Sequence, residues 1–128
     1  MNKILIVDDE PLLRRSLSKA VHSNSVEVMP VSTGEDALVE IGSCFYSLCF
    51  LDIHLSGTNG IDIMKKIKEI SPKTKVVIMS AHEITDDMKK EIEKSAYLFV
   101  PKPFDLSHVK AIVSEVLGDN YSNPNFFI

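Results

Sequence analysis

The chain has 128 residues, of which 45% are apolar and 25% are charged, values typical of one globular domain and unlike those of a disordered or fibrous chain. Fourteen Lys and Arg against 18 Asp and Glu give a net charge of −4, which argues against direct binding to nucleic acid or to anionic lipid. The apolar stretches are far shorter than the ~20 residues that span a bilayer, and no hydrophobic export segment begins the chain, so we expect no membrane association and a cytoplasmic location.

Short apolar runs rich in β-forming residues alternate along the chain with segments of helical spacing. The predicted strands are residues 4–7, 26–31, 48–51, 76–79 and 97–100. Because these runs lack polar alternation, they are typical of a parallel sheet that helices cover on both faces. The pattern predicts a (βα)5 doubly wound α/β domain over residues 1–118, followed by a C-terminal tail over 119–128 that ends in three apolar residues.

The predicted helices carry apolar side chains at helical spacing, strongest in the last one, which we expect to start near Asp105 or Ser107 and to stop at Gly118. The segment 83–95 differs from the others, because its apolar stripe is thin and the residues around it are charged. A weakly buried helix of this kind can shift between two positions at low cost. The apolar positions of the helical segments are Leu13, Leu17, Ala20 and Val21; Ala37, Leu38 and Ile41; Ile63, Met64, Ile67 and Ile70; Ile84, Met88 and Ile92; and Leu106, Val109, Ile112, Val113, Val116 and Leu117.

Polar residues follow four of the five predicted strands. Right-handed crossovers bring the carboxyl ends of parallel strands to one edge, so we expect these side chains to gather there. Carboxylates crowded together repel unless a cation neutralises them, and hard oxygen donors favour Mg²⁺. The residues are Asp8, Asp9 and Glu10 after the first strand, Asp52 after the third, Ser80 after the fourth and Lys102 after the fifth.

Asp52 stands alone at the end of the central predicted strand, between the acids of the first strand and Lys102. A carboxylate there can attack phosphorus and form an aspartyl phosphate, while a metal and a lysine hold the oxygens that accumulate charge. For any single Asp, a role as helix cap or turn residue is the more frequent one. For the set, independent caps do not explain why Ser80 and Lys102 follow the last two strands.

Four short strings resemble the receiver domain of bacterial two-component response regulators over about residues 2–118. The strings are ILIVDDE at 4–10, LDI at 51–53 with Gly60 eight residues after Asp52, MSA at 79–81 and KPF at 102–104. The resemblance implies the flavodoxin-like strand order 2-1-3-4-5. It also implies that Asp52 is phosphorylated by the phosphohistidine of a sensor histidine kinase or a phosphotransfer protein. Magnesium is then held by Asp8 or Asp9, by Asp52 and by the backbone carbonyl of His54.

The same resemblance implies that Ser80 and Lys102 contact the phosphoryl group and that Phe99 is a rotamer switch coupled to Ser80. Because the thinly anchored segment 83–95 lies between Ser80 and Phe99, we expect the output to pass to a downstream protein or domain, or to a homodimer, through the face formed by residues 83–117. The domain catalyses only its own phosphorylation and dephosphorylation. One departure bears on the site: many receivers have proline where this chain has Ser56, so the loop after Asp52 is expected to be looser.

Three other readings stay open. A phosphatase or phosphotransferase of the haloacid-dehalogenase type also uses an aspartyl phosphate, but it needs a second Asp two residues after the nucleophile, where this chain has His54. A nucleotide-binding α/β domain needs a glycine-rich loop after the first strand, where this chain has Asp8, Asp9 and Glu10. The chain can also be the receiver part of a longer regulator that carries an output domain.

Three smaller predictions concern single residues. His54 and His82 each lie two residues beyond a predicted site residue, so we expect them at the rim of the acidic pocket, where receivers tune phosphoryl lifetime. The two cysteines, Cys44 and Cys49, match no metal-ligand spacing and are expected to be buried, reduced thiols. The Lys102–Pro103 bond is expected to be cis, because that geometry aims the lysine back into the pocket.

Overall fold

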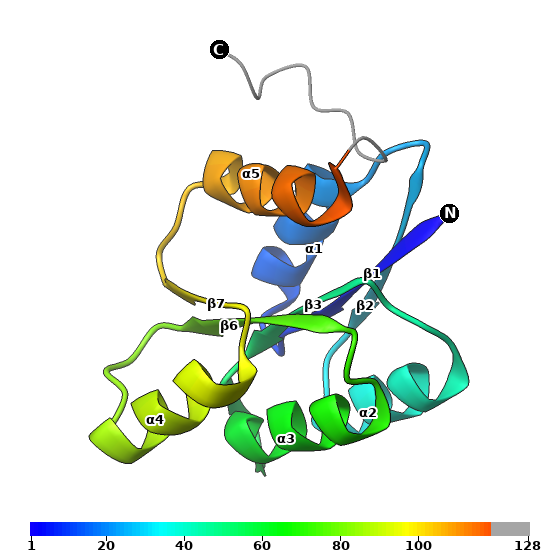
Figure 1. Cartoon of the computed structure of the whole chain (residues 1–128). Helices are drawn as coiled ribbons and strands as arrows, with labels where there is room; N and C mark the ends of the chain where they lie inside the picture. The colour runs from blue at the N-terminus through cyan, green and yellow to red at the C-terminus, as the bar shows by residue number, and fades with distance from the viewer. Residues whose placement is uncertain (119–128) are drawn as a thin grey trace.

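The computed structural model describes residues 1–118 and forms a five-stranded parallel sheet between two layers of helices (Figure 1). The sheet order is β2-β1-β3-β6-β7, and a separate two-stranded sheet pairs β4 with β5. With that hairpin set aside, this is the predicted order 2-1-3-4-5. The elements are β1 (Asn2–Val7), α1 (Pro11–Val21), β2 (Val26–Val31), α2 (Gly34–Ser43), β3 (Leu48–Asp52), β4 (His54–Leu55), β5 (Thr58–Asn59), α3 (Gly60–Ile70), β6 (Lys75–Ser80), α4 (Asp86–Ser95), β7 (Leu98–Pro101) and α5 (Leu106–Leu117).

Two hydrophobic cores lie on opposite faces of the sheet, because successive strand side chains point to opposite sides. Leu5 belongs to the core under α2, α3 and α4, whereas its neighbour Ile6 belongs to the core under α1 and α5. Figure 1 shows this division, with α1 and α5 above the sheet and the other helices below it. The runs in the central strands β1, β3 and β6 are therefore buried on both sides, whereas the edge strands β2 and β7 are only partly buried.

Helices α4 and α5 differ in how their first turns are capped. The thinly anchored helix α4 begins at Asp86, three residues later than the predicted start at 83, because Thr85 accepts a hydrogen bond from the backbone N–H of Met88 and acts as the N-cap. Asp105 stands at the N-cap of α5 without a side-chain cap bond, and α5 ends before Gly118, which has a φ of 60°. Only one residue of α4, Ile92, is buried.

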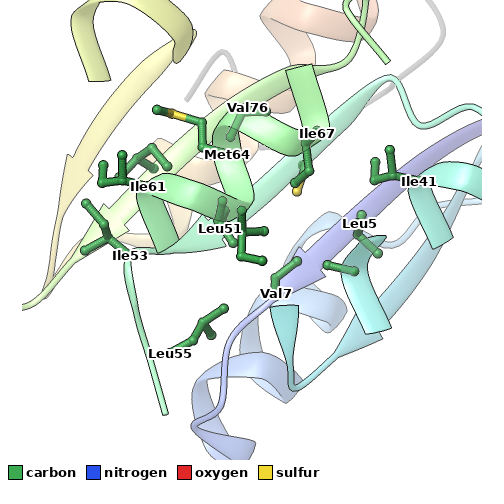
Figure 2. Close-up of a cluster of buried hydrophobic side chains, with 14 of the residues drawn as sticks. Leu5, Val7, Ile41, Leu51, Ile53, Leu55, Ile61, Met64, Ile67 and Val76 are labelled. Atoms are coloured by element: carbon green, nitrogen blue, oxygen red, sulfur yellow. The ribbon is translucent and has the colours of Figure 1, made fainter. Parts of the chain in front are cut away.

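A short hairpin of β4 and β5 follows β3 and was not predicted. It turns at Gly57, whose φ of 71° favours glycine. At its end Gly60 lies against the backbone of Ile53, where a Cβ atom would come within 2.5 Å of the Ile53 Cα. Figure 2 shows Ile53 and Leu55 at the end of the core of buried side chains between the sheet and α3. The hairpin is thus anchored at Ile53, the residue that follows Asp52.

Other predictions have the following outcomes. The Lys102–Pro103 bond is cis, as predicted. Cys49 is buried as predicted, whereas Cys44 is only half-buried, and neither forms a disulfide in the described part of the chain. No helix among residues 1–118 has the length and apolar character needed to cross a membrane. The predicted tail lies outside the described residues.

Candidate functional site

The carboxyl ends of β1, β3 and β7 meet at one edge of the sheet and bring together an acidic cluster around one lysine. The ammonium of Lys102 donates hydrogen bonds to Asp8 Oδ2 at 3.0 Å, to Asp52 Oδ2 at 2.8 Å and to Glu10 Oε1 at 3.3 Å. In the sequence, Asp8 is 94 residues from Lys102 and Asp52 is 50 residues from it. The expectation that the strand ends converge is therefore confirmed by direct contacts.

The second oxygen of each buried carboxylate is held by the turn that follows its strand. Asp8 Oδ1 accepts from the backbone N–H of Glu10 at 2.9 Å, and Asp52 Oδ1 accepts from the backbone N–H of His54 at 2.9 Å. Each carboxylate is thus fixed between a backbone donor and the ammonium of Lys102.

Burial and charge act in opposite directions on these groups. Burial raises the pKa of Asp8, and its hydrogen bonds from Glu10 and Lys102 only partly offset that effect. Burial of Lys102 favours the neutral amine, but the hydrogen bonds to Asp52 and Asp8 outweigh it and raise the pKa of the lysine above its ordinary 10.5. The lysine side chain, 8% exposed, stays charged and neutralises part of the cluster.

The carboxylates present a set of hard oxygen donors. One oxygen from each of Asp8, Glu10 and Asp52 lies within 4.8 Å of the others, a donor set that suits Mg²⁺ or a similar hard cation. Asp9 is turned away, because its Oδ2 accepts from Ser56 N at 2.9 Å and from Ser56 Oγ at 2.7 Å. These bonds lower the pKa of Asp9, with the hydroxyl contributing most.

The structure therefore groups Glu10, rather than Asp9, with the other two carboxylates. Sequence analysis did not single out Glu10 as a ligand, although it belongs to the same string as Asp8. Ser56 explains the difference: proline, common at this position in receivers, has no N–H to donate, whereas Ser56 supplies both a backbone and a hydroxyl donor. Only the spatial position of Ser56, 47 residues from Asp9, reveals this competition.

Ser80 and Phe99 line an open groove of about 410 Å³ beside Lys102. Ser80 is 2% exposed, and its hydroxyl donates to the backbone carbonyl of His82 at 2.9 Å and accepts from the His82 N–H at 3.2 Å. The hydroxyl thus bonds to its own loop rather than to Asp52 or Lys102. Phe99 is half-buried and packs against the core under α4.

A second groove of about 560 Å³ also includes Lys102 in its lining and was not predicted. It is lined by apolar side chains at the start of α1 and before α5, among them Leu12, Phe104 and Leu106. Leu12 is 78% exposed and Leu106 is 39% exposed, which is high for leucine. An apolar residue at the start of each helix is visible in the sequence, but the sequence pattern does not indicate that the starts of α1 and α5 are neighbours.

Comparisons with known proteins agree on one family. The family model described as "Response regulator receiver domain" matches residues 4–114. The chain is 35% identical over 117 residues to the transcriptional regulatory protein CiaR of Streptococcus pneumoniae, covering 91% of this chain and 52% of CiaR. It is 28% identical over 117 residues to the DNA-binding transcriptional regulator NtrC of Azospirillum brasilense, covering 91% of this chain and 24% of NtrC. The chain thus spans between about a quarter and a half of these relatives.

Solved structures show the same fold. A structure described as the BeF3-activated DrrB receiver domain superposes with a TM-score of 0.81 and 29% identity, covering 91% of this chain and 97% of that one. The response regulator TrrA of Thermotoga maritima, in complex with Mg²⁺ and BeF, gives a TM-score of 0.77 and 28% identity, covering 91% of this chain and 99% of that one. A CheY-like receiver domain of Methanospirillum hungatei, 21% identical, has a TM-score of 0.86 over 94% of this chain and 96% of that chain and shares the fold.

Proposed function

This chain belongs to the response regulator receiver domain family, and on that premise we propose that Asp52 accepts a phosphoryl group from the phosphohistidine of a sensor histidine kinase or a phosphotransfer protein. The observation that carries the proposal is the 2.8 Å contact between Asp52 Oδ2 and the ammonium of Lys102, within a cluster of hard oxygen donors. A nucleophilic carboxylate, a fixed cation and carboxylates that suit a metal are the parts that phosphoryl transfer to Asp needs.

The residues of the site would act as follows. A carboxylate oxygen of Asp52 attacks phosphorus, the P–N bond to the donor histidine breaks, and its electron pair stays on the imidazole. Lys102 stabilises the charge that gathers on the phosphoryl oxygens. When Mg²⁺ is bound it supplies further positive charge to those oxygens, and we assign its binding to Asp8, Asp52 and the backbone carbonyl of His54.

Glu10 stands closer to this metal-binding set than Asp9, and we propose it as the further carboxylate. Dephosphorylation is a separate hydrolysis, in which water attacks phosphorus, the bond between phosphorus and the Asp52 oxygen breaks, and inorganic phosphate is released. The domain would catalyse these two steps on itself and no reaction on another substrate.

We propose that phosphorylation is read through Ser80 and Phe99. The phosphoryl oxygens accept a hydrogen bond from Ser80, whose hydroxyl then leaves the His82 carbonyl and opens space next to Phe99. The half-buried Phe99 fills that space, and α4 shifts because only Ile92 anchors it deeply. A downstream protein, an output domain or a second copy of the chain reads the face made by residues 83–117.

The apolar groove beside Lys102 supports a protein as the phosphodonor. Leu12 and Leu106 are exposed and line the same groove as Lys102, where an apolar helix surface of the donor would cover them. We also infer a cytoplasmic location, which fits the unpaired Cys44 and Cys49. The greater length of CiaR and NtrC is consistent with this chain acting as the input part of a longer regulator.

The first experiment measures modification of Asp52 directly. The parent chain is incubated with Mg²⁺ and acetyl phosphate, and intact-mass analysis should show one added phosphoryl group. The addition should be absent in Asp52→Asn and after chelation of Mg²⁺, but present in the control Asp62→Asn, which changes an exposed carboxylate on α3. Equal phosphorylation of Asp52→Asn and the parent would show that another residue is the acceptor.

The second experiment separates the donor surface from the chemistry. Leu12→Ser should slow transfer from a phosphorylated kinase but leave phosphorylation by acetyl phosphate unchanged, because the small donor does not need the groove. Val39→Ser, at an exposed apolar position on α2, is the matched control and should change neither rate. If Leu12→Ser leaves the kinase reaction unchanged, the protein donor docks elsewhere.

A further inference from the structure

Two histidine rings stand edge to face at the rim of the acidic pocket, and neither ring has a role in the proposed phosphoryl transfer, which uses only the backbone of these residues. His54 begins β4, and His82 lies in the loop between β6 and α4. Their ring centroids are 4.8 Å apart with an interplanar angle of 86°, and both residues are exposed. Both residues follow the ends of neighbouring strands, since β3 and β6 pair in parallel and Asp52 lies opposite Met79.

The backbone of both histidines is fixed. The His54 N–H donates to Asp52 Oδ1, and His82 exchanges two hydrogen bonds with the Ser80 hydroxyl. The two Cβ atoms are therefore held by the strand ends, while the exposed rings can turn about their own side-chain bonds. A fixed backbone lowers the cost of forming a two-histidine metal site, because only the side-chain torsions of the two residues remain to be ordered when the ion binds.

The spacing suits a tetrahedral ion. A Zn–N bond is ~2.0–2.1 Å and the ring centroid lies ~1.1 Å further, so two imidazoles on one tetrahedral ion have centroids ~5 Å apart. The observed 4.8 Å agrees with that value. Binding requires one ring to rotate from its edge-to-face position so that both nitrogens point to the ion, and the exposure of both residues leaves room for this turn.

We propose that His54 and His82 form a binding site for a borderline transition-metal ion of the Zn²⁺ class. Imidazole nitrogen prefers Zn²⁺, Ni²⁺ or Cu²⁺, whereas the carboxylates of the neighbouring cluster prefer Mg²⁺, so the two sites differ in chemistry. The cluster of Asp8, Glu10 and Asp52 and the net charge of −4 favour the approach of any cation. Water completes the coordination of the ion, which ties the loop after β3 to the loop after β6.

The test uses the untagged full chain, freed of metal, with Zn²⁺ alone as the probe and excess Mg²⁺ present to occupy the carboxylate cluster. Calorimetry should show one Zn²⁺ per chain. His54→Ala and His82→Ala should each weaken binding at least about tenfold, because each removes one of two protein ligands. His22→Ala and His108→Ala change exposed histidines elsewhere and should bind Zn²⁺ as the parent does.

Histidine ring NMR signals give an independent measurement. On addition of Zn²⁺ the signals of His54 and His82 should shift together at one equivalent, and those of His22 and His108 should stay in place. Circular dichroism of the variants separates loss of a ligand from loss of the fold. Unchanged Zn²⁺ binding in either site variant, or displacement of Zn²⁺ by Mg²⁺ as expected for the carboxylate cluster, would overturn the proposal.

Discussion

Replacing Lys102 with Met should lower the free energy of unfolding, because it removes an ammonium group that contacts three carboxylates. Methionine retains the apolar stem of the lysine but leaves Asp8 and Asp52 buried without their ammonium partner. At an effective dielectric constant of ~20, two unit charges ~3 Å apart interact by about 5 kcal/mol, and two carboxylates ~5 Å apart repel by about 3 kcal/mol. Breaking such a buried pair costs about 3–5 kcal/mol in measured cases.

Proton uptake by a buried carboxylate limits how far Lys102→Met lowers the free energy of unfolding at neutral pH. Asp8 can take up a proton in place of the lost ammonium, and ~3 pKa units separate pH 7 from its ordinary pKa of 3.8, each worth about 1.4 kcal/mol. The expected loss is therefore about 3–4 kcal/mol at pH 7 and about 1 kcal/mol near pH 4.5.

The direction with pH follows from the folded-state pKa values. Burial already raises the pKa of Asp8, and loss of Lys102 raises it further, so the folded variant gains stability as pH falls through that value. In the parent, Lys102 has a raised pKa, so its contribution is complete below 10.5 and is lost only as pH rises through the folded value. The difference in free energy of unfolding between the parent and Lys102→Met should therefore become smaller as the pH falls.

Urea unfolding followed by circular dichroism, in the presence of a chelator, measures this loss at about pH 7 and about pH 4.5. Lys66→Met, at an exposed position of α3, is the control and should change stability by less than about 0.5 kcal/mol. A loss below about 1 kcal/mol at neutral pH, or the same loss at both pH values, would refute the view that Lys102 offsets carboxylate repulsion.

Two further predictions test the packing. Gly60→Ala should destabilise the fold by about 2–3 kcal/mol or more in urea unfolding, because the new Cβ meets the backbone of Ile53. The control Gly42→Ala, which has open space around it in α2, should stabilise the fold by about 0.5–1 kcal/mol. Equal effects of the two substitutions would contradict the close approach of Gly60 to Ile53. Iodoacetamide should modify half-buried Cys44 in the native state but not Cys49, because burial raises the pKa of the Cys49 thiol to about 12. Mass analysis should find both cysteines modified in urea. Modification of Cys49 in the native state would show that its strand opens readily.

Elements with a strong local pattern were predictable from the sequence. The runs at 48–51 and 76–79 contain too many consecutive apolar residues for any half-exposed strand, and β3 and β6 extend them by only one or two residues. Elements without such a pattern were not. The hairpin of β4 and β5 has two residues in each strand, too few for any periodicity. Helix α4 begins after the cap supplied by Thr85 and not at the predicted start at residue 83.

For the candidate site, sequence alone determined which residues stand at the edge of the sheet, because the crossover rule sends every parallel strand to end on the same side. It therefore predicted that Asp8, Asp52 and Lys102 would meet. The tertiary structure decided which way the remaining side chains point. Asp9 accepts hydrogen bonds from Ser56, and Glu10 accepts one from Lys102. Both donors are distant in the sequence, so their positions in the folded chain decide which carboxylate each donor reaches. The contact of His54 with His82 arises in the same way, from the pairing of two strands whose ends the sequence places 28 residues apart.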